Sequence, residues 1–304
     1  MVPPSIHIAH FSDVHLTAKP LGWRPGDLVS KRLTGWINVK LLGRGRRFKH
    51  APEVVEALMR ELRERDLDGL VFTGDATKLA FESEVVLAGR ALQVTDSTLP
   101  PGIAVPGNHD YYTPLAAQSG IFEREFAAWQ TGVRVESEPY PFARQIGPVW
   151  FIAVNSCTAN RFHMDASGAI GGLQLDRLRT LCGQLSPGPR VLVTHYPLRT
   201  ETGQLETRLR VLRDHTTALQ AAIDCRICLW LHGHIHRGFV RGSTDDVPFP
   251  LICAGSATQN NRMMYNEYLI DGNHLTGVRR VYDLETRQFF EADRFTILLP
   301  THQN

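Results

Sequence analysis

Five short motifs of carboxylate, amide and imidazole side chains recur along the sequence, each directly after an apolar run. They are SDVH, TGDA, PGNHD, VTHYP and HGHIH, and they supply Asp13, His15, Asp75, Asn108, His195, His234 and His236. A single motif of this kind more often forms a turn than a metal site. Oxygen and nitrogen donors in this mixture, however, suit divalent metals such as Mn²⁺, Fe²⁺ or Zn²⁺. Seven donors are too many for one ion, so the set predicts two ions about 3.5–4 Å apart that share a bridging carboxylate.

These motifs need strands to position them, and the hydrophobic pattern predicts an α/β fold. Predicted strands precede the motifs at 6–13, 68–75, 102–110, 190–197 and 225–234, and two more lie within 140–156. Segments with helical periodicity alternate with them at 51–66, 82–94, 115–130 and 171–185, and mainly short strands are predicted from 238 to 284. Ligands in α/β folds gather beyond the carboxyl ends of strands. Gly74, Gly107 and Gly233 each precede a predicted ligand, where glycine allows a close backbone approach.

The run LHGHIH contains three histidines in five residues, and they are not equivalent. Alternation along a strand would place His232, His234 and His236 on one side. Gly233 interrupts the strand, so His234 and His236 belong to the ligand loop. We predict that His232 ends the strand as a packed or hydrogen-bonded residue.

Composition sets broad limits on the protein. The chain has 304 residues, 43% of them hydrophobic, and a net charge of +2, so we expect a single domain over residues 1–304 with no partner class favoured by charge. Five irregularly spaced cysteines argue against a disulfide framework. The first residues lack a secretory signal pattern, and no apolar run reaches about 18 residues. We therefore expect a cytoplasmic protein.

The ordered series D-x-H, G-D, G-N-H-D, H and G-H-x-H, over roughly residues 8–240, resembles the calcineurin-like metallophosphoesterase superfamily. The resemblance implies a four-layer α/β/β/α sandwich with a dinuclear centre. It assigns one ion to Asp13, His15, Asp75 and His236, and the other to Asp75, Asn108, His195 and His234, with Mn²⁺ expected first and iron or zinc as alternatives. It also implies that His109 is the acid near the leaving group and that Asp110 orients it. Many members carry aspartate or asparagine where this chain has Lys78, which leaves open what supports that loop.

The resemblance also implies a reaction. Two ions would lower the pKa of a shared water to near 7 and stabilise the phosphoryl oxygens. We therefore expect hydrolysis of a phosphodiester or pyrophosphate bond. A cyclic-nucleotide phosphodiesterase would use the same centre, and a scaffold could keep the fold without catalysis. The presence of His109 and all seven ligand positions favours an enzyme over a scaffold.

A basic amphipathic insert at residues 22–50 separates the first motif from the first long helix. It has eight lysines and arginines against one acid, Asp27, and its apolar residues Val29, Leu33, Trp36, Ile37 and Leu41 recur at helical spacing. Three interpretations are open: a packed surface helix, a site for an anionic membrane surface or acylated substrate, and a nucleic-acid patch. The rest of the chain is not basic, which disfavours nucleic acid.

The position of the insert in the sequence favours a role in substrate binding. It follows the first ligand loop closely, so we expect it to border the metal site. The segment SKRLTGWIN also resembles one in bacterial members near the UDP-2,3-diacylglucosamine hydrolases. A phosphate-containing or lipid-linked nucleotide substrate is therefore expected, with a peripheral location on the inner membrane face. The candidate substrate-binding residues are Arg32, Trp36, Arg46 and Arg47.

Overall fold

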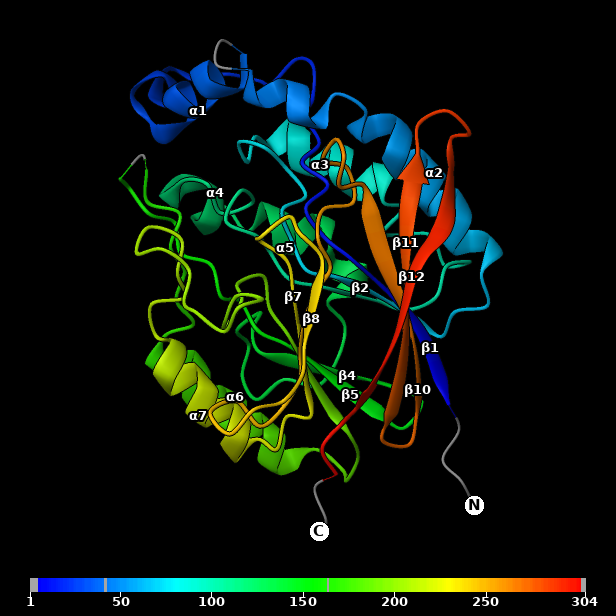
Figure 1. Cartoon of the computed structure of the whole chain (residues 1–304). Coiled ribbons are helices and arrows are strands. Elements are labelled where there is room, and N and C mark those ends of the chain that lie inside the picture. The colour runs from blue at the N-terminus through cyan, green and yellow to red at the C-terminus, as the bar shows by residue number, and fades with distance from the viewer. Residues whose placement is uncertain (1–4, 41–42, 163, 302–304) are drawn as a thin grey trace.

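Two six-stranded sheets lie at the centre of the computed structural model, which describes residues 5–40, 43–162 and 164–301 (Figure 1). In the first sheet β1 is parallel to β2, β2 is parallel to β3, and the other pairings are antiparallel. Its strand order is β12 (Gln288–Leu298), β11 (His274–Asp283), β10 (Met264–Asp271), β1 (Ile6–Phe11), β2 (Gly69–Phe72) and β3 (Gly102–Ala104).

The second sheet has a parallel centre and antiparallel edges. Strands β5, β6, β7 and β9 are parallel, whereas β4 and β8 are antiparallel to their neighbours. Its order is β4 (Phe142–Ile146), β5 (Val149–Ala153), β6 (Arg190–Val193), β7 (Leu229–His232), β9 (Leu251–Cys253) and β8 (Phe239–Arg241).

Helices cover the outer face of each sheet. Helices α2 (Ala51–Glu64), α3 (Glu82–Ala91) and α5 (Ile121–Glu125) pack on the first sheet, and α6 (Gly172–Gln184) and α7 (His215–Asp224) pack on the second. Shorter pieces complete the described helices: α1 (Lys31–Lys40), α4 (Pro114–Gln118) and the 3₁₀ turns η1 (Pro25–Val29), η2 (Arg44–Phe48) and η3 (Ala127–Trp129). None of these helices is long and apolar enough to cross a membrane.

Side-chain alternation builds the layers. In β1, Ile6 and Ile8 face the second sheet, while Ala9 and Phe11 face the helices, as a period of two requires. A third apolar cluster fills the space between the sheets, with Val71, Phe151, Val193, Leu231 and Tyr268 among its members. The predicted α/β/β/α sandwich is therefore confirmed.

Three predicted elements differ from the structure. The helix expected at 115–130 is divided into α4, α5 and η3, because Gly120 has a φ of 60° between the first two. Strands β10 and β11 are longer than predicted, at 8 and 10 residues, and β12 lies beyond the predicted strands; the three pair along an antiparallel meander. The strand expected from 225 begins at Leu229, since Cys225 ends α7.

The insert forms η1, α1 and η2 and packs on the domain through its tryptophans. Trp36 packs with Trp23, at a ring separation of 6.1 Å, onto a cluster that contains Leu79, Phe81 and Tyr112. The predicted apolar face is only partly buried, because Val29 is 90% exposed. Leu41, which was also predicted for that face, lies outside the described residues.

Candidate metal centre

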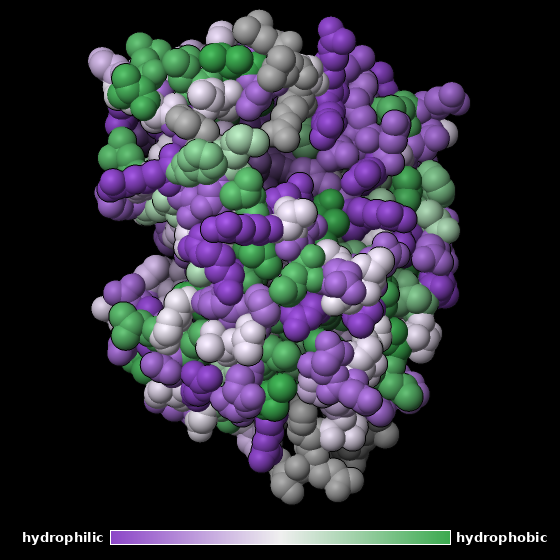
Figure 2. All heavy atoms as spheres, turned by 60° about the vertical axis from the view of Figure 1, so that its left-hand side comes forward, coloured by the Kyte–Doolittle hydropathy of each residue, from purple (hydrophilic) through white to green (hydrophobic). Residues whose placement is uncertain are grey.

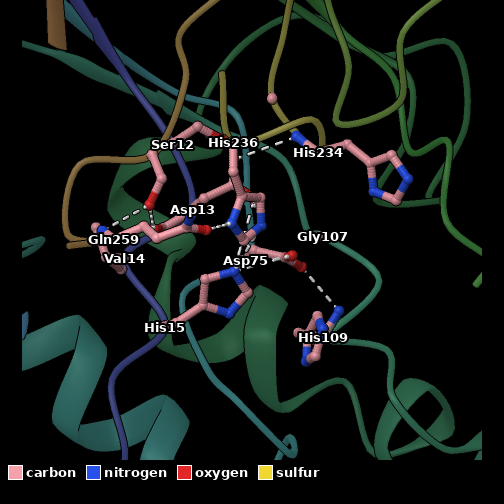
Figure 3. A network of polar contacts seen from close by, with 12 residues as sticks. Ser12, Asp13, Val14, His15, Asp75, Gly107, His109, His234, His236 and Gln259 are labelled. Carbon is pink, nitrogen blue, oxygen red and sulfur yellow. Dashed lines mark hydrogen bonds and ion pairs between the residues drawn. The ribbon is translucent and has the colours of Figure 1, made fainter. Parts of the chain in front are cut away.

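The ends of neighbouring parallel strands bring the predicted ligands together (Figure 3). After β1 and β2 end, their loops stay paired: the Asp13 amide donates to the Gly74 carbonyl at 2.9 Å, and the His15 amide donates to the Asp75 carbonyl at 3.0 Å. The second sheet does the same, since the Gly233 amide donates to the His195 carbonyl at 3.0 Å. The two sheets thus supply ligands from opposite sides of one site.

The backbone at this site is strained. Asp13, His15, Asp75, His234 and His236 all have φ between 43° and 70°, in the left-handed region that residues with a Cβ rarely adopt. Each such residue costs roughly 1–2 kcal/mol. Strain of this kind persists where the surrounding structure holds it for function. Five of the seven predicted ligands share it, which marks the loops as built around the site.

The first ligand group is Asp13, His15, Asp75 and His236, whose donor atoms all lie within 4.8 Å of one another. Asp13 Oδ1 is 2.9 Å from His236 Nε2, and the Nε2 atoms of His15 and His236 are 3.1 Å apart. These are the four residues that the resemblance assigns to one ion.

The second ligand group joins the first through one carboxylate oxygen. Asn108 Oδ1 is 2.9 Å from His234 Nδ1 and 3.2 Å from His195 Nε2. Asp75 Oδ2 is 3.5 Å from His195 Nε2 and also 3.5 Å from His15 Nε2. The same oxygen therefore lies between the two groups, where a bridging ligand must be.

In three histidine ligands, the hydrogen bond made by Nδ1 shows that Nε2 is the nitrogen that faces the site. His15 Nδ1 lies 3.1 Å from the Thr77 carbonyl oxygen, His195 Nδ1 2.7 Å from that of Thr73, and His236 Nδ1 2.6 Å from Gln259 Oε1. These acceptors place the hydrogen on Nδ1 and leave a lone pair on Nε2. Lone pairs of His15 and His236 then face each other at 3.1 Å. A metal cation between the two nitrogens makes that arrangement favourable, so the donor set fits a metal ion.

The charges at the site lead to the same conclusion. Asp13, Asp75 and Asp110 are all buried, and in the described part of the chain no lysine or arginine forms an ion pair with any of them. Burial, together with the charges of Asp13 and Asp110, raises the pKa of Asp75 well above its usual value. Buried carboxylates without a countercharge are unfavourable, and bound cations supply that charge.

Asp110 does not orient His109, which corrects the sequence prediction. His109 Nδ1 lies 2.6 Å from the Lys78 carbonyl oxygen. The Asp110 carboxylate instead accepts hydrogen bonds from the amides of Ala76, Thr77 and Gly107 at 2.9–3.1 Å. Asp110 therefore holds the loop that carries Asp75, and the backbone of that loop orients His109.

The same contacts show what supports the loop in which Lys78 departs from the family pattern. The Asp110 carboxylate accepts from the amides of Ala76 and Thr77 at the start of this loop. The Glu84 carboxylate accepts from the Leu79 amide at 2.9 Å near its end. The Lys78 ammonium lies 5.6 Å from the centre of the Phe48 ring rather than against a carboxylate of the site. The loop is thus held without the usual acid at position 78.

Arg32 and Trp36, predicted to bind substrate, have structural roles instead. The Arg32 guanidinium donates to Asp27 Oδ1 at 2.7 Å and to the carbonyl oxygens of Leu79 and Ala80, and its side chain is buried. Because those contacts use the donor groups, little remains for a ligand. Trp36 is half-buried in the packing beneath the insert.

Arg46 and Arg47 are exposed close to the metal ligands. Their backbone carbonyls accept from the side chain and amide of Asn260 at 2.8 and 2.7 Å. In the described part of the chain, no hydrogen bond or ion pair holds their guanidinium groups. Phe48, which follows them, packs its ring 4.5 Å from that of His15. These two arginines remain candidates for substrate contact.

Sequence reasoning missed four residues around the ligands. Gln259 holds His236, Phe48 packs on His15, Tyr112 stacks on His109 with ring centres 5.4 Å apart, and Arg210 donates to the His234 carbonyl at 3.3 Å. Gln259 follows β9, which ends beside β7, so its strand-end position was the one available signal. Tyr112 lies two residues beyond the PGNHD motif and Phe48 lies in the insert, but neither ring had a role in the predicted ligand set. Arg210 comes from a loop that no motif identifies.

Replacing His232 by leucine is expected to leave both ions bound, whereas His234→Leu should lose the ion of the second group. His232 is buried, its Nδ1 lies 3.0 Å from the Gly233 carbonyl oxygen, and its ring packs 5.3 Å from Phe239 rather than at the ligands. Metal analysis of the purified variants checks this. Loss of an ion from His232→Leu would contradict the assignment.

Gly107→Ala is expected to disrupt the site and lower stability by about 1–3 kcal/mol, as overpacking does. A Cβ at this position would lie 2.1 Å from Asp75 Oδ1 and 2.2 Å from the Asp75 amide nitrogen. Gly183→Ala in α6 is the matched control, because its Cβ would meet nothing within 4 Å. Thermal unfolding and metal content of the two variants test the difference, and equal behaviour would show that Gly107 has no spatial role.

Several solved structures share the fold of this chain. A dimetal phosphatase from Danio rerio has the same fold, with a TM-score of 0.66 at 11% identity over 97% of this chain and 99% of that chain. The purple acid phosphatase of yellow lupin gives 0.61 at 10% identity, covering 97% of this chain and 54% of its own. An anchor protein of the inner membrane complex of Plasmodium gives 0.55 at 10% identity over 98% and 90%.

The family assignment rests on the sequence itself. No curated protein sequence matches the chain. The sequence model of the calcineurin-like phosphoesterases, however, matches residues 6–238, which is most of the chain and includes all seven ligand positions. The chain therefore belongs to the calcineurin-like phosphoesterase family, and it is a metal-dependent phosphoester hydrolase of that family.

Proposed function

We propose that the protein hydrolyses a phosphodiester or pyrophosphate bond at two divalent metal ions. The observation that supports this most strongly is the position of Asp75 Oδ2, 3.5 Å from a histidine nitrogen of each ligand group. Asp13, His15 and His236 complete one group, and Asn108, His195 and His234 complete the other. When bound, two such ions supply an activated water and positive charge against the phosphoryl oxygens. Mn²⁺ is the proposed metal, with iron or zinc as alternatives, since the donors are oxygen and nitrogen without sulfur.

The chain contributes the proton for the leaving group through His109. Its Nδ1 is held by the Lys78 carbonyl, so Nε2 is the atom that transfers the proton. Burial, followed by the nearby His15, lowers the pKa of His109 well below its usual value. The negative charge of a bound phosphate ester favours protonation of the ring and thereby prepares the acid.

The proposed substrate is a lipid-linked nucleotide such as UDP-2,3-diacylglucosamine. Support comes from the place of the insert, whose Phe48 packs on His15 and whose exposed Arg46 and Arg47 lie beside that contact. Apolar and cationic groups next to a phosphoesterase centre suit a molecule with acyl chains and a phosphate. The protein would act in the cytoplasm, at the inner face of the membrane.

Hydrolysis assays test the proposal and separate its alternatives. With added Mn²⁺ we expect turnover of bis-p-nitrophenyl phosphate, its loss in EDTA and its return when metal is restored. Parallel assays with UDP-2,3-diacylglucosamine and 3′,5′-cyclic AMP then decide between the lipid-linked nucleotide and a cyclic nucleotide. Absence of turnover on all three by the metal-loaded protein would favour a non-catalytic scaffold.

A further inference from the structure

Three separate segments expose apolar side chains on one side of the molecule. They are Leu28 and Val29 in η1, Phe162 and Met164 in the loop after β5, and Leu205 and Leu209 in the loop before α7. Val29 is 90% exposed, Phe162 60% and Met164 72%. On the face shown in Figure 2, hydrophobic side chains gather at the upper left beside hydrophilic ones. We call Leu28, Val29, Phe162, Met164, Leu205 and Leu209 the apolar rim.

Hydrogen bonds join the three segments into one surface. The Lys31 ammonium, next to η1, donates to the Asp165 carbonyl at 2.9 Å. The Ala166 amide donates to the Leu209 carbonyl at 2.8 Å, and the Asp165 amide donates to the Phe162 carbonyl at 3.1 Å. The three segments are therefore neighbours in the fold, although Lys31 and Asp165 are more than 100 residues apart in the sequence.

The rim borders the metal centre on two sides. On the side of the insert, the Lys31 ammonium lies 4.8 Å from the centre of the Tyr112 ring, which stacks on His109. On the other side, Arg210 follows Leu209 and donates to the His234 carbonyl at 3.3 Å. A surface that the rim covers would therefore lie next to the metal ligands.

Cationic side chains alternate with the apolar ones. Arg161 precedes Phe162 and Arg208 precedes Leu209, and both arginines are exposed. Arg210, which follows Leu209, is instead paired with Glu206 at 3.5 Å. Exposed Arg46 and Arg47 add to this charge from the insert. Apolar side chains that enter the lipid headgroup region, surrounded by arginine and lysine, are the pattern of a protein that lies on an anionic membrane. A second copy of the chain fits less well, because a two-fold contact would bring like charges together.

We propose that the apolar rim docks on an anionic lipid bilayer and that the metal centre then faces the lipid headgroups. Val29, Phe162 and Met164 enter the headgroup boundary, and the neighbouring arginines contact lipid phosphates. This extends the membrane role beyond residues 22–50 to two loops that the sequence did not single out. It concerns the location of the protein and does not depend on which phosphate ester is cleaved.

Vesicle flotation with the metal-loaded full chain tests the docking surface. We expect binding to phosphatidylcholine vesicles that contain phosphatidylglycerol and little binding to phosphatidylcholine alone. Val29→Asp, Phe162→Asp and Met164→Asp should each weaken binding about tenfold or more, as expected for losing one buried apolar side chain. Leu173→Asp in α6 is the matched control, because Leu173 is 78% exposed but lies outside the rim, and it should bind as the parent does.

The outcomes separate docking from catalysis. All four variants should hydrolyse bis-p-nitrophenyl phosphate at the parent rate, since none of the changed residues touches a metal ligand. Lack of vesicle binding, equal binding to neutral vesicles, or equal weakening by Leu173→Asp would each overturn the docking surface. Self-association that Phe162→Asp abolishes, without vesicle binding, would assign the rim to a second copy and would also overturn it. Loss of hydrolysis by the parent would count only against the proposed reaction.

Discussion

Asp75→Asn is expected to lower kcat by about a thousandfold or more, because it removes the ligand shared by both ions. Asp75 Oδ2 lies 3.5 Å from both His15 Nε2 and His195 Nε2, which places this carboxylate between the two ligand groups. An amide keeps the shape of the side chain but not its negative charge. Hydrolysis of bis-p-nitrophenyl phosphate and metal analysis measure the two effects together.

Stability measurements show whether Asp75→Asn acts through metal rather than through folding. Burial, followed by the charges of Asp13 and Asp110, raises the pKa of Asp75. The metal-free variant should therefore unfold at the same temperature as the metal-free parent, or higher, because a repelling charge is removed. Added Mn²⁺ should stabilise the parent and fail to stabilise the variant. Asp176→Asn, at an exposed position in α6, is the control and should retain activity. A variant that keeps parental turnover would refute the bridging role.

His109→Gln is expected to lower kcat by about 10²–10⁴-fold, the usual range for loss of a general acid, while both ions remain bound. His109 contributes its backbone amide to Asp75 Oδ1 at 2.8 Å, and this contact survives the substitution. The Lys78 carbonyl holds the imidazole of His109 at Nδ1. Glutamine has no side-chain group that can take up and release a proton in this position. Steady-state kinetics and metal analysis of the same preparation provide the measurement.

The leaving group distinguishes an acid from a purely structural histidine. An acid matters most when the departing oxygen is strongly basic, as in an alkyl phosphodiester, and least for p-nitrophenolate. The defect of His109→Gln should therefore be larger on the alkyl ester. Equal defects on both substrates, or loss of an ion, would show that His109 positions the site and does not transfer a proton.

The ligand loops could be predicted because their chemistry is local in sequence. Each of the seven ligands follows an apolar strand, and parallel strands necessarily place their carboxyl ends at one edge. The prediction for His232 rested on the same logic, since Gly233 marks where the strand stops. What the sequence could not reveal was which groups hold the histidine nitrogens. The Lys78 and Thr73 carbonyls and Gln259 have no side-chain signature or lie in unmarked loops.

The insert shows where composition misleads. Arg32 belongs to a basic amphipathic segment, yet it is buried against Asp27 and the carbonyls of Leu79 and Ala80. A count of charges cannot tell a cation that holds a loop in place from one that meets a ligand. The apolar rim is likewise hidden in the sequence, because Val29, Phe162 and Leu209 come together only through tertiary contacts.

Metal stoichiometry tests the central claim most directly. After reconstitution with Mn²⁺ and removal of excess metal, elemental analysis of the parent should find two ions per chain. Asn108→Ala should retain one, because Asn108 contacts only the second group, through His195 and His234. A parent that binds one ion or none, or an Asn108→Ala protein that still binds two, would contradict the dinuclear centre.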